Sequence, residues 1–184
     1  MRTPFLAAPP ARRGFSIVEM VVVFAIVTIA ISMFARTLAS SKKLDPIATE
    51  TTVAASGART MIEQMKNHPF EQVFALYNDV KSDDPGGAGT APGNQFDIEG
   101  LTPLTPGGHC GTIVFPEKDG KLREDSDDTN LGMPRDLNAD GQVDGVDHAA
   151  DAVILPIRIR VEWIMHGTKD THRWFEMYTM FGRY

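Results

Sequence analysis

The longest hydrophobic run of the chain lies near its N-terminus, between residues 15 and 35. This run contains no Gly or Pro, and it includes a single carboxylate, Glu19. A helix needs about 20 consecutive apolar residues to cross the hydrocarbon core of a bilayer, so the run predicts a transmembrane helix. An ionisable side chain inside such a helix is costly, and Glu19 is therefore expected to have a specific role.

The pattern after this run predicts a second, amphipathic half of the same helix. Residues 36–45 remain compatible with a helix, and Pro46 is expected to mark a kink or a restart. Apolar residues then recur at the spacing of one helix face: Ala54, Ala58, Met61 and Met65. Residues 67–69 end this segment, and a short second helix is expected to follow, with an apolar face made of Phe70, Val73, Phe74 and Tyr77.

The C-terminal part of the chain predicts a small antiparallel sheet. Residues 154–165 alternate between apolar and charged positions, 166–170 read as a turn, and 171–181 read as the return strand of a hairpin. A short strand is expected at residues 111–115, whereas the Gly- and Pro-rich residues 82–109 are expected to form a surface loop. The predicted inward-facing residues are Ile157, Ile159, Val161, Trp163, Phe175, Met177 and Phe181. The expected fold class is α+β, with a long N-terminal helix packed on this sheet.

Composition narrows the possible functions. The formal net charge is −6, and an acidic body argues against a nucleic-acid-binding surface. Cys110 is the single cysteine, so no internal disulfide is possible, and the protein must be held together by its core or by a metal. The five histidines are scattered and Cys110 has no C-x-x-C partner, so neither a zinc or redox site nor a cysteine nucleophile is favoured. No enzymatic activity is expected.

The residues around the start of the apolar run form a motif. Two basic residues, Arg12 and Arg13, precede Gly14; Phe15 follows, and Glu19 is the fifth residue counted from Phe15. This arrangement resembles the prepilin-type signal of bacterial type IV pilins and type II secretion pseudopilins. The resemblance implies that a prepilin peptidase cuts between Gly14 and Phe15, that Phe15 becomes an N-methylated terminus, and that Glu19 guides assembly.

Two other interpretations of the N-terminus remain open. A simple signal anchor would also place a basic segment before an apolar span, with the N-terminus in the cytoplasm. A cleaved secretory signal peptide is the other, although its apolar region is usually only about 7–15 residues long.

The resemblance implies a domain organisation and a location. Residues 1–14 would be a leader peptide, 15–45 a transmembrane and assembly helix, and 46–184 a periplasmic or extracellular pilin-like head. The protein would be a single-pass inner-membrane protein that later enters a filament. Its partners would be the prepilin peptidase, other pilin or pseudopilin subunits and the inner-membrane assembly platform. The lack of a disulfide pair favours a pseudopilin, but the choice between pilus and pseudopilus stays open.

An acidic insert lies before the predicted hairpin. Residues 117–151 contain eleven acidic and four basic residues, and within them residues 136–147 read DLNADGQVDGVD. This stretch resembles the calcium loop of EF-hand and dockerin modules, in which oxygen ligands recur at alternate positions and a glycine allows the sharp turn. The resemblance implies the ligands Asp136, Asn138, Asp140, Gln142 (backbone carbonyl), Asp144 and Asp147. It also implies that Val143 anchors the loop to the core.

The insert therefore predicts a structural Ca²⁺ ion with modest affinity, in the range of ~10⁻⁴–10⁻³ M. The loop departs from most EF-hands because its last ligand is Asp147 and because flanking helices are not expected. A solvated acidic turn without an ion is the alternative. An insert of this size is typical of a minor subunit at a filament tip. The alternative function is a membrane-anchored, calcium-dependent binding or adhesion module that does not polymerise.

Overall fold

The computed structural model of the chain describes residues 16–165 and 171–183, and for residues 39–47 it describes the backbone only. Gly14, Phe15 and the predicted turn at 166–170 therefore lie outside the described residues. The chain divides into two compact units, of which the first ends at Asp45 and the second begins at Pro46.

A single helix, α1 (Ile17–Lys66), passes through the boundary between the two units. The expectation that the helix restarts at Pro46 is wrong, because this residue lies within the continuous helix. A proline inside a helix costs about 3 kcal/mol, since it removes one backbone hydrogen bond and crowds the preceding turn. Helical residues on both sides and the packing of residues 50–65 in the second unit offset this cost.

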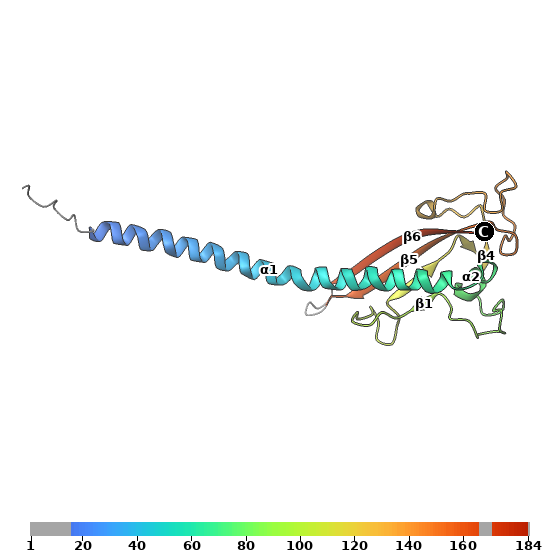
Figure 1. Cartoon of the computed structure of the whole chain (residues 1–184), viewed down its shortest axis with the longest axis horizontal. Helices are drawn as coiled ribbons and strands as arrows, with labels where there is room; N and C mark the ends of the chain where they lie inside the picture. Colours follow the sequence, from blue (N-terminus) through green and yellow to red (C-terminus); the bar gives the residue numbers. More distant parts are fainter. Residues whose placement is uncertain (1–15, 166–170, 184) are drawn as a thin grey trace, which may run out of the picture. The chain divides into compact units, whose positions relative to one another are not determined.

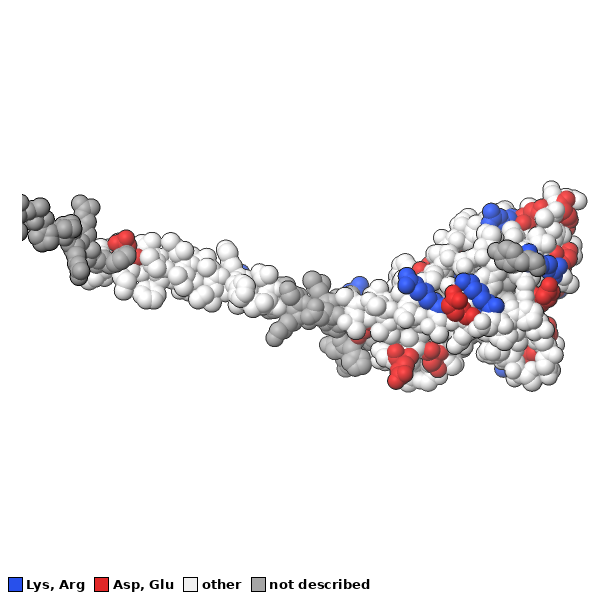
Figure 2. All heavy atoms as spheres, in the orientation of Figure 1, with Lys and Arg blue, Asp and Glu red and all other residues white. Residues whose placement is uncertain are grey.

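The part of α1 in the first unit has the properties of a membrane span. Residues Ile17–Leu38 form a stretch of 22 residues with a mean hydropathy of 2.6, none of it buried, which is long and apolar enough to cross a membrane. The hydroxyl of Thr28 donates a hydrogen bond to the Phe24 carbonyl at 2.7 Å, and Ser32 does the same to Thr28. These polar side chains are thus satisfied within the helix. Figure 2 shows that the described surface of this segment is almost free of charged side chains.

The second unit contains a four-stranded antiparallel sheet. Its strand order is β1 (Gln95–Phe96), β2 (Gly111–Val114), β5 (Ile154–Ile164) and β6 (His172–Gly182). The pairing of β5 with β6 runs from Ile154↔Gly182 to Ile164↔His172, which confirms the predicted hairpin and strand. Figure 1 shows the C-terminal part of α1 along one side of this sheet, with the loops before β5 beside the start of that strand.

The core lies between the sheet and the helices. The inward face of β5 is fully buried at Ile157, Ile159 and Val161, as the alternating pattern predicted. The helices contribute Ala54, Ala58, Ile62 and Met65 from α1, and Val73, Phe74 and Tyr77 from α2 (Phe70–Tyr77). The indole N–H of Trp163 donates a hydrogen bond to the buried carboxylate of Glu50 at 2.8 Å, which ties β5 to α1. The α+β fold class is thus confirmed.

Four short elements interrupt the regions that read as loops. Strand β1 lies inside the Gly-rich segment, and the acidic insert begins with a small hairpin of β3 (Glu117–Lys118) and β4 (Lys121–Leu122). A short 3-10 helix, η1, follows at Thr129–Leu131. The two-residue strands have no periodic signature, because two residues are too few to show an alternation.

Candidate functional sites

The N-terminal motif is represented in the described residues by Glu19. This residue lies in the first turn of α1, where its side chain is exposed among apolar neighbours. The unpaired N–H groups at a helix N-terminus favour a negative charge, so this location reduces the free-energy cost of placing the Glu19 carboxylate in an apolar segment.

The predicted calcium loop, residues 136–147, is irregular and tightly turned. Gly141 has a φ of 87° and Ala139 a φ of 64°, so both occupy the left-handed region that a sharp reversal requires. Side-chain oxygens accept backbone hydrogen bonds from residues further along: Asp136 from Ala139 (2.6 Å) and Gly141 (2.8 Å), Asn138 from Asp140 (3.1 Å), and Asp140 from Gln142 (2.8 Å). Figure 2 shows acidic side chains over the loops that precede β5 in Figure 1.

A buried carboxylate from outside the loop bonds to the start of the loop and to its ninth position. Glu124, directly after the β3–β4 hairpin, is only 1% exposed. One of its oxygens, Oε1, accepts hydrogen bonds from the backbone N–H groups of Leu137 (2.6 Å) and Asn138 (3.3 Å). The other oxygen, Oε2, accepts from the N–H of Asp144 (3.2 Å) and lies 3.7 Å from Nε2 of His148.

The imidazole of His148 lies next to this carboxylate and is also buried. Its Nε2 lies 3.1 Å from Oδ1 of Asp144, and its Nδ1 lies 3.1 Å from Oδ1 of Asp151. Burial opposes protonation, but the hydrogen bonds with Asp144 and Asp151 and the charge of Glu124 outweigh it and raise the pKa of His148. The hydrogen bond from the Val146 N–H, followed by that from His148, lowers the pKa of Asp144.

The donor set of the loop suits a hard cation, because calcium prefers oxygen ligands and all six predicted ligands are oxygen atoms. The loop brings these donors together only in part. Among the described residues, the acidic and histidine side chains whose ligand atoms lie within 4.8 Å of one another are Glu124, Asp144 and His148. Only Asp144 in this group is a predicted ligand. Ligation by all six predicted groups would therefore require the other predicted ligands to move closer to Asp144.

The anchor of the loop differs from the expected one. Val143 is 49% exposed, so the expectation that it fixes the loop to the core is wrong. Leu137, at the second position of the loop, is fully buried and has this role. The reason is that no α-helix adjoins residues 136–147 in the described part of the chain, so position eight has no helix pair to pack against.

Glu124 and His148 were not recognised from the sequence as site residues. His148 had a weak signal, since it follows the loop directly and stands four residues after Asp144. Glu124 had none, because it is one acidic residue among many and its contacts are with residues 13–20 positions away.

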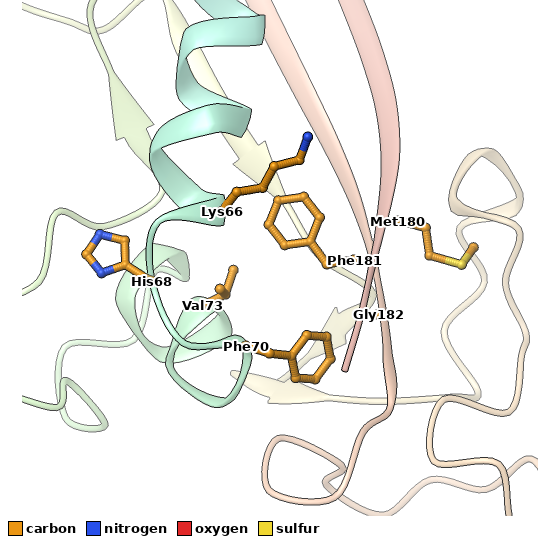
Figure 3. Close-up of a pocket in the computed structure, with 7 residues that line it drawn as sticks. All are labelled: Lys66, His68, Phe70, Val73, Met180, Phe181 and Gly182. Carbon is orange, nitrogen blue, oxygen red and sulfur yellow. The ribbon is translucent and has the colours of Figure 1, made fainter. Parts of the chain in front are cut away.

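A hollow of about 370 Å³ lies between the end of α1, the start of α2 and the end of β6 (Figure 3). The rings of Phe70 and Phe181 and the side chain of Val73 face this space, Lys66 extends past Phe181, and His68 points away from it. The close group of acidic and histidine ligands named above lies elsewhere.

Cys110 is buried directly before β2, where burial and the charge of Asp97 raise the pKa of its thiol. A thiol with a raised pKa is a poor nucleophile, because the thiolate is the reactive form.

The described residues form an α+β fold with an acidic insert, and residues Ile17–Leu38 are long and apolar enough to cross a membrane. The family model of the prokaryotic N-terminal methylation motif matches residues 9–35. These residues therefore carry a type IV pilin-like prepilin signal, which implies processing by a prepilin peptidase and assembly with other pilins. No curated protein and no solved structure matches the chain.

Proposed function

We propose that the chain is a structural subunit of a type IV pilus or of a type II secretion pseudopilus. The observation that carries this proposal is the prepilin signal at residues 9–35, joined to a helix whose apolar side chains from Ile17 to Leu38 are all uncovered. An exposed apolar surface of this size needs a bilayer or other helices to cover it. A bilayer would cover this surface while the precursor is held in the membrane, and the helices of neighbouring subunits would cover it in the filament.

In this proposal Glu19 sets the register of assembly. Cleavage between Gly14 and Phe15 would create a positively charged α-amine at the N-terminus of α1, where the helix dipole already favours negative charge. An unpaired charge in a low-dielectric layer is far costlier than a paired one. A subunit would therefore settle in the filament only when its amine meets the Glu19 carboxylate of a neighbour.

We further propose that residues 136–147 hold a structural calcium ion. Two observations support this proposal. Oxygen donors alternate along the loop, and the left-handed backbone at Gly141 allows the chain to turn sharply there. The ion would offset the mutual repulsion of the four carboxylates in the loop and so stabilise the insert.

The first test is the intact mass and N-terminal sequence of the protein isolated from its native membranes. A chain that begins at N-methylated Phe15 would support the proposal. A chain that keeps the leader would contradict it and would favour the membrane-anchored calcium-binding module instead.

A second test uses variants of the span. Glu19→Ala is expected to abolish incorporation into sheared filaments, as measured by immunoblotting, while the protein remains in the membrane. Thr28→Ala is the matched control, because the Thr28 hydroxyl already bonds within its own helix. Equal incorporation of both variants would contradict the role of Glu19.

A further inference from the structure

In the described part of the chain no α-helix flanks the predicted calcium loop, yet one buried side chain, Glu124, bonds to two separate segments of it. We propose that Glu124 sets the calcium affinity of the loop by holding its backbone in a closed conformation, without being a ligand itself. The closed conformation is the one in which the Glu124 carboxylate bonds to the backbone N–H groups of Leu137 and Asp144. This inference rests on the proposed calcium function of residues 136–147. Glu124 is therefore a positioning residue.

The contacts of Glu124 reach from the second to the ninth of the twelve loop positions. Its Oε1 bonds to the N–H groups of Leu137 and Asn138, at the second and third positions, at 2.6 and 3.3 Å. Its Oε2 bonds to the N–H of Asp144, at the ninth position, at 3.2 Å. One side chain thus links the segment that carries the first ligands to the segment that carries the later ones.

The burial of Glu124 makes this link conditional on closure. A carboxylate that is 1% exposed is tolerated only when hydrogen bonds replace the water it has lost. Those bonds come here from loop N–H groups, and His148 lies 3.7 Å away. Opening the loop would remove the donors and leave the charge unsatisfied, so the buried carboxylate favours the closed backbone.

We assign Glu124 no role as a ligand, because it lies outside residues 136–147, which carry all six predicted ligands. Both of its oxygens already accept hydrogen bonds from backbone N–H groups. The predicted ligands instead come from residues 136–147, and Glu124 orients the backbone from which they project.

The expected effect follows from preorganisation. A loop whose backbone is already turned loses less conformational freedom when the ion arrives, so it binds more tightly than a free loop of the same sequence. Residues that orient metal ligands typically change metal affinity by about 10–100-fold when they are substituted.

The test compares calcium binding by the full chain and its variants in detergent, with CaCl₂ as the titrant in isothermal titration calorimetry. Glu124→Gln keeps the shape of the side chain but places an amide N–H₂ opposite one set of N–H donors. We expect it to weaken calcium binding by about 10–100-fold. The matched control is Asp127→Asn, which removes the same charge from an exposed residue of the same segment. We expect this control to change the affinity by less than about fivefold.

A second variant separates geometry from charge. Glu124→Asp keeps the charge but shortens the side chain by one methylene, so its two oxygens cannot reach the N–H groups of Leu137 and Asp144 at the same time. We expect it to weaken binding as well, and an affinity equal to the wild type would overturn the inference. Amide hydrogen exchange in calcium-free buffer supplies an independent measurement: protection at Leu137, Asn138 and Asp144 should fall in both Glu124 variants and not in Asp127→Asn.

The outcomes distinguish this inference from the calcium proposal on which it rests. If the wild-type chain takes up no calcium, the calcium function itself fails, and the inference fails with it. If the wild type binds calcium and Glu124→Gln binds it as tightly as Asp127→Asn, the calcium function stands and the role of Glu124 is overturned.

Discussion

The anchoring of the acidic insert provides a sharp test, because the structure and the resemblance to calcium loops assign the anchor to different residues. The structure assigns it to Leu137, which is fully buried, whereas the resemblance assigns it to Val143, which is 49% exposed. We therefore compare two truncations to alanine, Leu137→Ala and Val143→Ala, in the full chain.

The magnitudes differ because of burial. Leu137→Ala removes three buried carbon groups, a loss of about 2.4 kcal/mol at about 0.8 kcal/mol each. The cavity left behind brings the expected total to about 3–5 kcal/mol. Val143→Ala removes two carbon groups that are already half solvated, so we expect less than about 0.8 kcal/mol and no cavity.

Urea titration in detergent micelles measures both variants. The chain has two tryptophans. One of them, Trp163, is buried in the core and 2% exposed, so its fluorescence reports unfolding of the head. Equal losses of stability in the two variants, or a larger loss for Val143→Ala, would refute the assignment of the anchor to Leu137.

Three further predictions concern the stability of the head. Calcium at about ten times its dissociation constant should stabilise the full chain by about 1.4 kcal/mol against urea, reversibly with a chelator, and identical curves with and without calcium would contradict a bound ion. Burial, with the charges of Asp79 and Asp83, raises the pKa of Glu117, so the wild type should lose stability as pH rises from the unfolded pKa through this raised value. One buried oxygen of Glu117 has no hydrogen-bond partner among the described residues, so Glu117→Gln should increase the free energy of unfolding by about 1 kcal/mol at pH 7. The variant should gain no stability in acid, where the wild-type carboxyl is protonated, and a loss of stability at pH 7 would contradict this reasoning. Gly57→Ala would place a Cβ 2.6 Å from the Ile98 side chain and should destabilise the head by about 1–3 kcal/mol, with partial rescue by Ile98→Ala; full stability of Gly57→Ala alone would show that the contact relaxes freely.

The long elements could be predicted from the sequence because their periodicity repeats often enough to be recognised. The alternation along residues 154–165 placed Ile157 and Ile159 on the buried face. The spacing of apolar residues in residues 54–65 likewise predicted the buried positions Ala54, Ala58 and Met65, although Met61 is only partly buried and its neighbour Ile62 is buried. In both cases the local pattern and the tertiary packing agree, so the pattern alone was sufficient.

The site in the insert could be predicted only in part. The spacing of oxygen donors in residues 136–147 is a local property and is visible in the sequence. The role of Glu124 depends on bonds to residues 13–20 positions away, and no local pattern specifies such bonds. Val143 was assigned by analogy with loops that lie between two helices, and the analogy failed because those helices are absent among the described residues around the insert.

The insert is also bonded to the sheet, which links the proposed ion to the core of the head. The carbonyl of Leu137 accepts hydrogen bonds from the N–H groups of Val153 (2.8 Å) and Ile154 (3.1 Å), at the start of β5. A second link is the ion pair between Asp128 and Arg158, at 3.1 Å. Since Leu137 is held at its N–H by Glu124 and at its carbonyl by β5, closure of the loop and pairing of β5 with β6 stabilise each other. Calcium is therefore expected to increase the hydrogen-exchange protection of β5 as well as of residues 136–147. Protection confined to the loop would show that the two are independent.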